Sequence, residues 1–342
     1  MSTLHYSIII PHKNRIALLE NLLISIPARP DIEVIIIDDA SEDRAKIEAL
    51  ILDFSTRFGQ LQLIFNPGDR SLGAGWARNQ AITIVKGEYV LFADSDDSFT
   101  PDAFNHFDQI RTNHPTVDLC LFRSQSIGMD GSPSTRTDFT NFLIEYAFSL
   151  DNHAKHAKLL RQIASKIDPP WAKLIKRTLL DNPSCRFEEI IVSNDILFNL
   201  CVVQHAQQMH IRSETVYCVL DHAETLGNLR TKESLDIRFN TSLRNIHALS
   251  ESSFAPAKPI SVCGGYVWRA RQFGLKVFFA YLRHAMEQRA PLYYPWYRYI
   301  MALYYKLMGY NPLKIRAFII FGKSSKTYSI KKSAVTKIQP NV

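Results

Sequence analysis

Long apolar runs are missing from this chain. No stretch reaches the roughly 18 consecutive apolar residues that a membrane-spanning helix needs, because Lys314 and Arg316 interrupt even the late run around RAFIIFG. The start, MSTLHYSIIIPHKNR, lacks the basic segment followed by an apolar one that marks an export signal. The sequence therefore predicts a cytoplasmic protein that does not cross a bilayer, with a peripheral place on the inner face of the membrane left open.

Cysteine is scarce and shows no pattern. The five cysteines are odd in number and no two are separated by two residues, which excludes the usual zinc and redox spacings; they are Cys120, Cys185, Cys201, Cys218 and Cys263. We expect reduced, mostly structural thiols.

Glycine-rich phosphate motifs are absent as well. The loop GAGWARN at residues 73–79 contains neither GxGxxG nor GxxxxGK, which argues against a dinucleotide-binding dehydrogenase and a P-loop kinase. Its glycines are expected to permit a close backbone approach. Arg78 and Asn79 would then face a cleft or be buried as a polar pair.

Acidic residues are almost absent from the C-terminal part. Residues 255–342 hold 15 Lys and Arg against one acid, Glu287, whereas the first 254 residues carry 25 bases and 32 acids. Segments such as VWRARQFGLKVFFAYLRHAM and YYPWYRYIMALYYKLMGY mix aromatic and basic residues at helical spacing. This pattern favours either an amphipathic surface for an anionic membrane or an ordinary helical subdomain. No nucleic acid partner is expected, because no nucleic-acid-binding motif is present.

Apolar runs and helical stretches alternate over the first hundred residues, which predicts an α/β fold with a mostly parallel sheet flanked by helices. The expected strands are 6–10, 33–37, 61–65 and 89–92, and the expected helices are 15–25, 42–58 and 74–85. A strand at 117–122, helical stretches at 141–163 and 194–203, and helix-compatible segments beyond residue 230 follow.

Polar clusters follow three of these strands. They are PHKNR at 11–15, DDAS at 38–41 and DSDD at 94–97. Ligands of open α/β sheets bind beyond the carboxyl ends of the strands, so the three clusters should lie along one edge. The acids of the third cluster either hold a hard divalent cation or cap the next helix. In the second cluster, Asp39 is the expected ligand contact and Asp38 the expected cap.

Taken together, these segments resemble the family 2 glycosyltransferases with a GT-A fold. SIIIPHKNR, EVIIIDDAS, GAGWARNQAI and GEYVLFADSDD match the opening of that family over residues 1–110. The resemblance implies a nucleotide-sugar donor, usually a UDP-sugar, with Asp39 at the nucleoside, Asp94 near the ribose or base, and Asp96 on Mn²⁺ or Mg²⁺. Further donor contacts would come from Pro11, Lys13, Asn14, Arg15, Arg78 and Ser95. Lys13 stands where the family commonly has an aromatic residue.

The resemblance also implies a catalytic base. WAKLIKRTLL followed by FEEIIVSNDILFNLCVV is similar to the segment in which the family places that residue, ordinarily the Asp of a Glu-Asp pair. Here the pair is Asn194-Asp195, so Asp195 carries over as the base of an inverting hexosyl transfer. The alternative is a charge at a helix N-terminus. Glu188 and Glu189 are expected to form a solvated turn, with a role as substitute base left open.

Three regions are expected. Residues 1–110 would bind the nucleotide-sugar, 111–228 would bind the acceptor and carry the base, and 229–342 would form a basic, aromatic-rich helical region. The acceptor would be a hydroxyl of a cell-envelope glycan such as lipopolysaccharide or capsule, free or lipid-linked. Two alternatives are a catalytically silent GT-A protein that binds carbohydrate or membrane, and a sugar nucleotidyltransferase. The second is disfavoured because PHKNR has no glycine.

Overall fold

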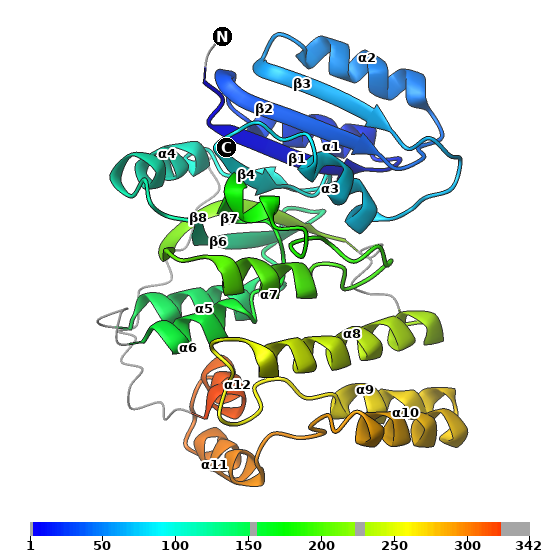
Figure 1. Cartoon of the computed structure of the whole chain (residues 1–342), viewed down its shortest axis with the longest axis vertical. Coiled ribbons are helices and arrows are strands. Elements are labelled where there is room, and N and C mark those ends of the chain that lie inside the picture. Colours follow the sequence, from blue (N-terminus) through cyan, green and yellow to red (C-terminus); the bar gives the residue numbers. More distant parts are fainter. Residues whose placement is uncertain (1–2, 151–155, 223–229, 323–342) are drawn as a thin grey trace.

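An eight-stranded sheet forms the upper part of the molecule in this computed structural model, which describes residues 3–150, 156–222 and 230–322 (Figure 1). Its strands are β1 (Tyr6–His12), β2 (Arg29–Asp38), β3 (Phe58–Phe65), β4 (Tyr89–Phe92), β5 (Ser98–Phe99), β6 (Leu119–Gly128), β7 (Lys173–Lys176) and β8 (Met209–Asp221). Their spatial order is β3-β2-β1-β4-β7-β6-β8-β5. The pairs β1/β2, β1/β4, β2/β3 and β6/β8 are parallel, whereas β7 is antiparallel to both of its neighbours. The predicted mostly parallel sheet is confirmed.

Helices cover both faces of the sheet. One face packs against α1 (Ile16–Ser25), α2 (Arg44–Phe54) and α4 (Ala103–Asn113). The other packs against α3 (Ala74–Ile82), α5 (Asp138–Phe148), α6 (Ala157–Ala164) and α7 (Ile196–His205). Side chains alternate along β1, so that Ile8 and Ile10 enter the first core and Ile9 enters the second. This buried alternation on two faces explains the continuous apolar runs of the central strands.

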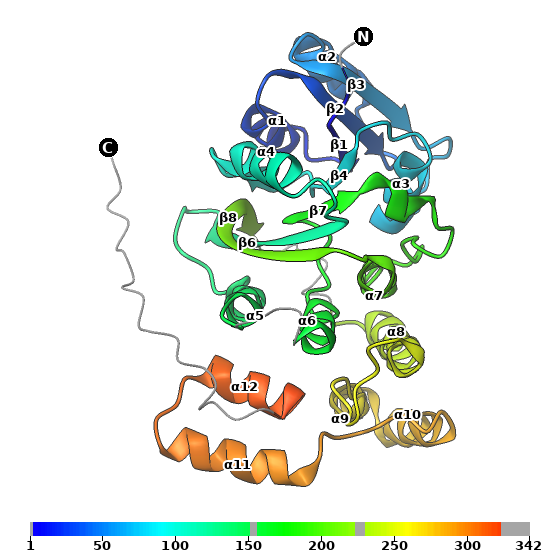
Figure 2. The same ribbon diagram turned by 60° about the vertical axis from the view of Figure 1, so that its left-hand side comes forward.

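The C-terminal region is helical in its described part, as predicted. It contains α8 (Lys232–Glu251), α9 (Gly264–Arg269), α10 (Leu275–Glu287), α11 (Trp296–Leu307) and α12 (Pro312–Phe321). Helices α8, α9 and α10 share a separate core, whereas α12 contributes Ala317 and Phe321 to a core of the sheet. Both views place α10 and α11 at the end of the molecule opposite α2 and β3 (Figures 1 and 2). No described helix has the length and apolar character to span a membrane.

Several predicted boundaries are wrong. The helix expected at 42–58 ends at Phe54, because Phe58 already pairs with Arg29 of the neighbouring strand. The helical stretch expected at 141–163 is divided between α5 and α6, and residues 151–155 lie outside the described part. The strand expected at 117–122 continues to Gly128, because β8 runs alongside it. Pro11, expected in a loop, is a buried residue of β1 opposite Ile37.

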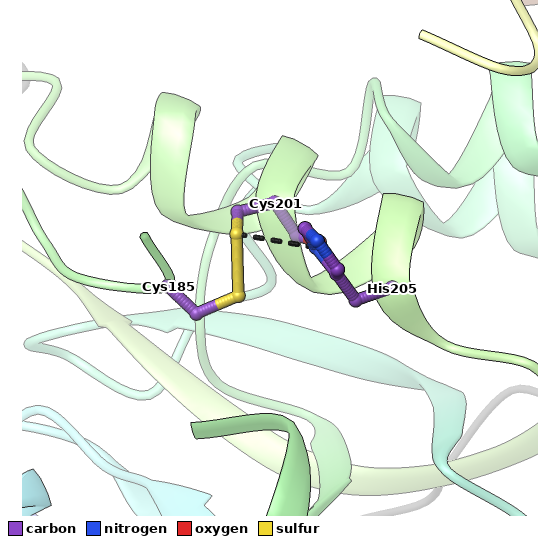
Figure 3. A group of neighbouring side chains, drawn as sticks. All are labelled: Cys185, Cys201 and His205. Carbon is purple, nitrogen blue, oxygen red and sulfur yellow. Dashed lines mark hydrogen bonds between the residues drawn. A yellow bond between two sulfur atoms is a disulfide. The ribbon is translucent and has the colours of Figure 1, made fainter. Parts of the chain in front are cut away.

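Two of the five cysteines form a disulfide, so the prediction of reduced thiols is wrong for Cys185 and Cys201 (Figure 3). Their separation of 16 residues carries no signal in the sequence, but the fold places their Cα atoms 5.4 Å apart, within bridging range. His205 lies beside the bridge, with Nδ1 3.5 Å from Sγ of Cys201. The remaining cysteines are free and buried, as expected.

Reduction of this disulfide should lower the free energy of unfolding by about 3 kcal/mol, because a cross-link across a loop of this length restricts the unfolded chain. Urea titrations with and without dithiothreitol would measure the difference. The double variant Cys185→Ser, Cys201→Ser serves as the control and should not respond to the reductant. Identical titration curves for the reduced and oxidised wild type would contradict the prediction.

Candidate active site

The three polar clusters meet at the carboxyl edge of the sheet, as the sequence predicted. The backbone N–H of Asp39, after β2, donates to the carbonyl of His12 at the end of β1 (2.8 Å). From the loop after β1, Arg15 reaches the loop after β4, where its guanidinium lies 3.3 Å from Oδ2 of Asp96. Segments 80 or more residues apart in sequence therefore face the same space, because parallel strands end at a common edge.

The loop after β1 is tied to the loop after β2. Asn14 adopts a left-handed backbone conformation with φ of 58°, which asparagine tolerates better than most residues. Its N–H donates to Oγ of Ser41 (2.8 Å), and its side-chain oxygen accepts from the N–H of Glu42 (2.9 Å). Lys13 stays exposed beside it. The loop therefore offers an exposed ammonium group on a fixed backbone.

Asp39 is buried and saturated with hydrogen bonds. Its carboxylate accepts from the side chains of Asn66 (2.8 Å) and Ser71 (2.5 Å) and from the N–H groups of Leu72 (2.8 Å) and Gly73 (2.7 Å). Burial alone would raise the pKa of Asp39, but these donors outweigh it and the pKa lies below its ordinary value. Asp39 therefore carries a stable negative charge and orders the loop that leads into α3.

Asp38 does not cap the next helix, contrary to the prediction. It accepts from the N–H (3.0 Å) and the hydroxyl (2.5 Å) of Ser41, which closes a local turn. The cap of α2 is Asp43, whose side chain accepts from the N–H of Lys46 at 3.2 Å. Asp38 is therefore a structural residue of the loop after β2.

The acids of the DSDD loop after β4 do not cap the following helix. Helix α4 begins after Asp102, so none of the acids 94–97 caps it. Ser95 and Asp97 are buried, whereas Asp94 and Asp96 are partly exposed. Burial, together with the two neighbouring carboxylates, raises the pKa of Asp97 well above its ordinary value. Negative charge at the loop surface is therefore carried by Asp94 and Asp96.

Sequence reasoning missed His222. Its Nε2 lies 2.8 Å from Oδ2 of Asp96 and 2.7 Å from the guanidinium of Arg15. The carboxylate oxygen of Asp96 and the ring nitrogen of His222 therefore both lie against the guanidinium of Arg15. The signal was available, because His222 follows the apolar strand β8 in the same way that Asp39 follows β2. Its distance of 126 residues from Asp96 concealed the pairing.

Potential metal ligands are not gathered in threes at this edge. Over residues 3–150, 156–222 and 230–322, only Cys185, Cys201 and His205 bring three such atoms within 4.8 Å of one another. Asp96 and His222 form a pair. Mg²⁺-type sites commonly use one or two protein ligands and complete the shell with substrate phosphates and water. An oxygen and nitrogen pair of this kind therefore suits a cation that arrives together with a diphosphate.

Arg78 connects the DSDD loop to the segment that carries Asp195. It is buried in α3 and donates to Oδ1 of Asp94 (2.6 Å) and to Oδ1 of Asn194 (3.0 Å). Its guanidinium also lies over the ring of Phe187, 5.0 Å from the centroid. The sequence left open whether Arg78 faces a cleft or is buried, and the structure shows it buried and bridging.

Gly75 makes that bridge possible. A Cβ atom at this position would lie 2.2 Å from the carbonyl oxygen of Glu188, so any larger residue would push α3 away from the segment before Asp195. The predicted role of the loop glycines in close backbone approach is confirmed here. Asn79 strengthens the contact, since its side chain donates to the carbonyl of Phe187 (2.9 Å) and accepts from the same residue's N–H (2.9 Å).

Asp195 stands at the N-cap position of α7, but its side chain makes no capping hydrogen bond. Burial raises the pKa of Asp195, while the positive charges of Arg78 and Lys173 act in the opposite direction. Lys173 is itself buried, and its ammonium donates to Asn199 and to the carbonyl of Ile167 (both 2.6 Å). Among the described residues the carboxylate is neither used as a cap nor paired with a cation. Burial lowers the pKa of Lys173 to about 7, so Arg78 is the cation that most favours the ionised form of Asp195.

Trp171, Glu188 and Glu189 belong to the two segments that lead to Asp195. Trp171 stacks on Tyr217 with ring centroids 5.5 Å apart, which places it in the core. Glu188 accepts from Arg244 at 2.6 Å, and Glu189 is exposed. The solvated turn expected for these two acids is confirmed for Glu189, whereas Glu188 is half-buried in an ion pair.

Comparison with known proteins decides the family. Residues 7–182 match the profile described as glycosyl transferase family 2, which is more than half of the chain. The chain belongs to glycosyl transferase family 2.

The named relatives are distant in sequence. The chain is 24% identical to the uncharacterized glycosyltransferase EpsJ of Bacillus subtilis, over 67% of this chain and 65% of that one. It is 26% identical to the poly(ribitol-phosphate) beta-N-acetylglucosaminyltransferase TarS of Staphylococcus aureus, over 62% of this chain and 35% of that one. The matches thus span less than two thirds of the length of these relatives.

Solved structures of two glycosyltransferases share the fold. The crystal structure of S. aureus TarS 1–349 in complex with UDP-GlcNAc matches with a TM-score of 0.57 and 17% identity, over 79% of this chain and 73% of that one. The mannosyltransferase PcManGT from Pyrobaculum calidifontis, in complex with GDP-Man and Mn²⁺, matches with a TM-score of 0.50 and 16% identity, over 97% and 89%. The predicted GT-A type architecture is confirmed.

Proposed function

We propose that this family 2 protein is a metal-dependent, inverting glycosyltransferase that moves a sugar from a nucleotide diphosphate donor to a glycan hydroxyl. One observation carries the proposal: Arg78 joins Asp94, on the donor side, to Asn194, next to Asp195. A charged donor site and an unpaired carboxylate thereby belong to one rigid network. Residues 1–110 would bind the donor, and residues 111–228 would bind the acceptor.

The donor would lie along the carboxyl edge of β1, β2 and β4. The exposed ammonium of Lys13 and the guanidinium of Arg15 would meet phosphate oxygens, with Pro11, Asn14 and Ser95 shaping the floor. Asp39 would bind the nucleoside by replacing one of the four hydrogen bonds that its carboxylate accepts. The bond from Ser71 is the easiest to replace, because its hydroxyl can rotate away. The UDP-GlcNAc bound by TarS supports a UDP-sugar as the donor.

Asp96 and His222 would hold Mn²⁺ or Mg²⁺. Their ligand atoms are 2.8 Å apart, close to the roughly 3 Å between neighbouring ligands of an octahedral ion with bonds of about 2.1 Å. When bound, the ion neutralises the charge that develops on the diphosphate leaving group. Arg15, which lies against both ligands here, would turn toward the diphosphate. The Mn²⁺ and GDP-Man of PcManGT support this assignment.

Asp195 would act as the base. It takes the proton from the acceptor hydroxyl while that oxygen forms a bond to the anomeric carbon and the bond from this carbon to the diphosphate breaks. Attack opposite to the leaving group inverts the anomeric configuration. A carboxylate can do this at neutral pH only while ionised, and the positive charge of Arg78 favours that form. Arg78 is thus a positioning residue for both halves of the site.

Arg78→Gln should move the acidic limb of the kcat profile to higher pH, since loss of a nearby cation raises the pKa of the Asp195 carboxylate. The base works in its ionised form, so activity falls as the pH drops through its pKa. If that pKa is higher, activity is lost at a higher pH. A pH series of transfer rates measures this, with the surface variant Arg177→Gln as control. A uniform drop at every pH would indicate a purely structural role.

The acceptor class is proposed from the relatives. TarS is named a poly(ribitol-phosphate) beta-N-acetylglucosaminyltransferase. We propose a cell-envelope glycan such as lipopolysaccharide or capsule, carried on a lipid at the inner face of the membrane. A lipid-linked acceptor would bring a cytoplasmic enzyme to an anionic membrane surface.

Isothermal titration with UDP, GDP, CMP and ADP, each with and without Mn²⁺, tests the donor proposal. Tight binding of one nucleoside diphosphate only in the presence of Mn²⁺ is expected. Absence of binding to all four would favour a catalytically silent GT-A protein. Pyrophosphate release from a nucleoside triphosphate and sugar phosphate would favour a nucleotidyltransferase.

A further inference from the structure

The outward side of α11 is built from large apolar side chains. They recur every three or four residues, so they lie on one side of the helix; they are Trp296, Tyr299, Ile300, Leu303, Tyr304 and Leu307. All six are exposed, from 41% for Tyr299 to 78% for Leu307. The inward side consists of Arg298, Ala302 and Tyr305. The helix therefore turns its larger apolar side to the surface.

Arg298 fixes α11 in this rotation. Its side chain is only 3% exposed, and its guanidinium donates to the carbonyls of Ile320 (2.7 Å), Ile319 (3.0 Å) and Pro259 (3.3 Å). Ile319 and Ile320 belong to the last turn of α12, where a cation also meets the negative end of the helix dipole. Rotating α11 to bury its apolar side would remove these bonds and leave the carbonyls without them, so the exposure is part of the packed structure.

A second exposed apolar row lies on α10. Leu275, Phe279 and Met286 are each at least 60% exposed. Of the 20 large hydrophobic side chains that are exposed in the described residues, 14 lie between Trp268 and Tyr310. Helices α10 and α11 lie at the same end of the molecule in both views (Figures 1 and 2). Such concentration marks an interaction surface, since scattered exposed hydrophobics would need no explanation.

The positive charge around this surface favours an anionic partner. Residues 255–322 hold 10 Lys and Arg and a single acid, Glu287, which is paired with Arg283 at 3.0 Å. Trp and Tyr side chains favour the headgroup level of a bilayer, and basic side chains are attracted to anionic lipid. A second copy of the chain would instead bring like charges together.

We propose that the outward sides of α10 and α11 form a docking surface for an anionic lipid bilayer, on which the protein lies without spanning it. The surface shares no residue with the candidate active site. Membrane docking therefore goes beyond the proposed transfer reaction, and each can fail without the other.

Co-sedimentation of the full chain with vesicles tests this. Vesicles of phosphatidylcholine and of equimolar phosphatidylcholine and phosphatidylglycerol would be compared at low and high salt. We expect binding to the anionic vesicles only, weakened by salt. The double variant Leu303→Ser, Leu307→Ser should bind roughly tenfold more weakly, because it removes apolar area from the buried side. The matched control Ile24→Ser, Leu52→Ser, at exposed positions of α1 and α2, should bind like the wild type.

Three results would overturn the proposal: no binding to anionic vesicles, equal binding to both vesicle types, or unchanged binding of the α11 variant. Light scattering tests a fourth. If the wild type is a dimer and the α11 substitutions convert it to a monomer, the surface binds a second copy of the chain and not a membrane. Circular dichroism spectra and thermal unfolding midpoints of both variants should match the wild type. Those readouts confirm that the variants are folded and keep the test separate from the donor proposal.

Discussion

Asp195→Asn should lower kcat for sugar transfer by roughly two to four orders of magnitude, the usual contribution of a general base. The amide has nearly the same shape but cannot accept the proton of the acceptor hydroxyl. Because the Asp195 side chain makes no capping hydrogen bond, the substitution should leave α7 intact. Donor affinity should remain at its wild-type value, since the base acts on the acceptor.

Single-turnover transfer and nucleotide titration together check this result. Glu189→Gln is the matched control, because Glu189 is an exposed acid six residues earlier and the sequence left it open as a substitute base. Its rate should equal that of the wild type. If Asp195→Asn kept full activity while Glu189→Gln lost it, the base would be assigned to the wrong acid.

Asp96→Asn should abolish the Mn²⁺ dependence of nucleotide binding and lower transfer by roughly two orders of magnitude or more, since metal stabilisation of a leaving group supplies several kcal/mol. An amide oxygen carries no net charge and binds a divalent cation weakly. His222→Ala should act in the same direction, because Nε2 of His222 lies beside the same oxygen of Asp96.

Titration of UDP against Mn²⁺ concentration measures the effect. Asp102→Asn is the control, since Asp102 is an exposed acid just beyond the DSDD loop. Wild-type Mn²⁺ dependence in Asp96→Asn would remove Asp96 from the metal site. If Asp96→Asn lost the Mn²⁺ dependence of UDP binding and His222→Ala kept it, Asp96 would be a metal ligand and His222 would not.

Local sequence patterns predicted five of the eight strands and the edge of the sheet at which the polar clusters lie, but not β5, β7 and β8. Runs such as SIII and VIII are strands because their alternate side chains enter two cores, and that pattern is visible within a few residues. The acids and bases after those runs had to share one edge, because parallel strands end together. The position of Asp39, Asp94 and Asp96 at this edge was predicted in this way, and their roles remain proposals.

Helix ends and loop contacts were predicted less well. Whether Asp38 or Asp43 caps α2 depends on where the helix begins, and sequence spacing does not fix the first residue of a helix. The extension of β6 to Gly128 depends on β8, which comes some 80 residues later in the chain.

Contacts between distant segments were decided by the tertiary structure alone. The pairing of Asp96 with His222 and the bridge from Asp94 through Arg78 to Asn194 join residues that no local pattern relates. The Cys185–Cys201 disulfide has the same origin.

The sequence by itself determined the fold class, the ligand edge of the sheet and the basic, aromatic character of the C-terminal region, since each depends on the order of neighbouring residues. Only the tertiary structure decided which carboxylates are saturated, which are paired, and which side of α11 faces outward. The physical reason is that hydrogen bonds and burial depend on what the rest of the chain brings near. For α11 this is Arg298 held by the last carbonyls of α12.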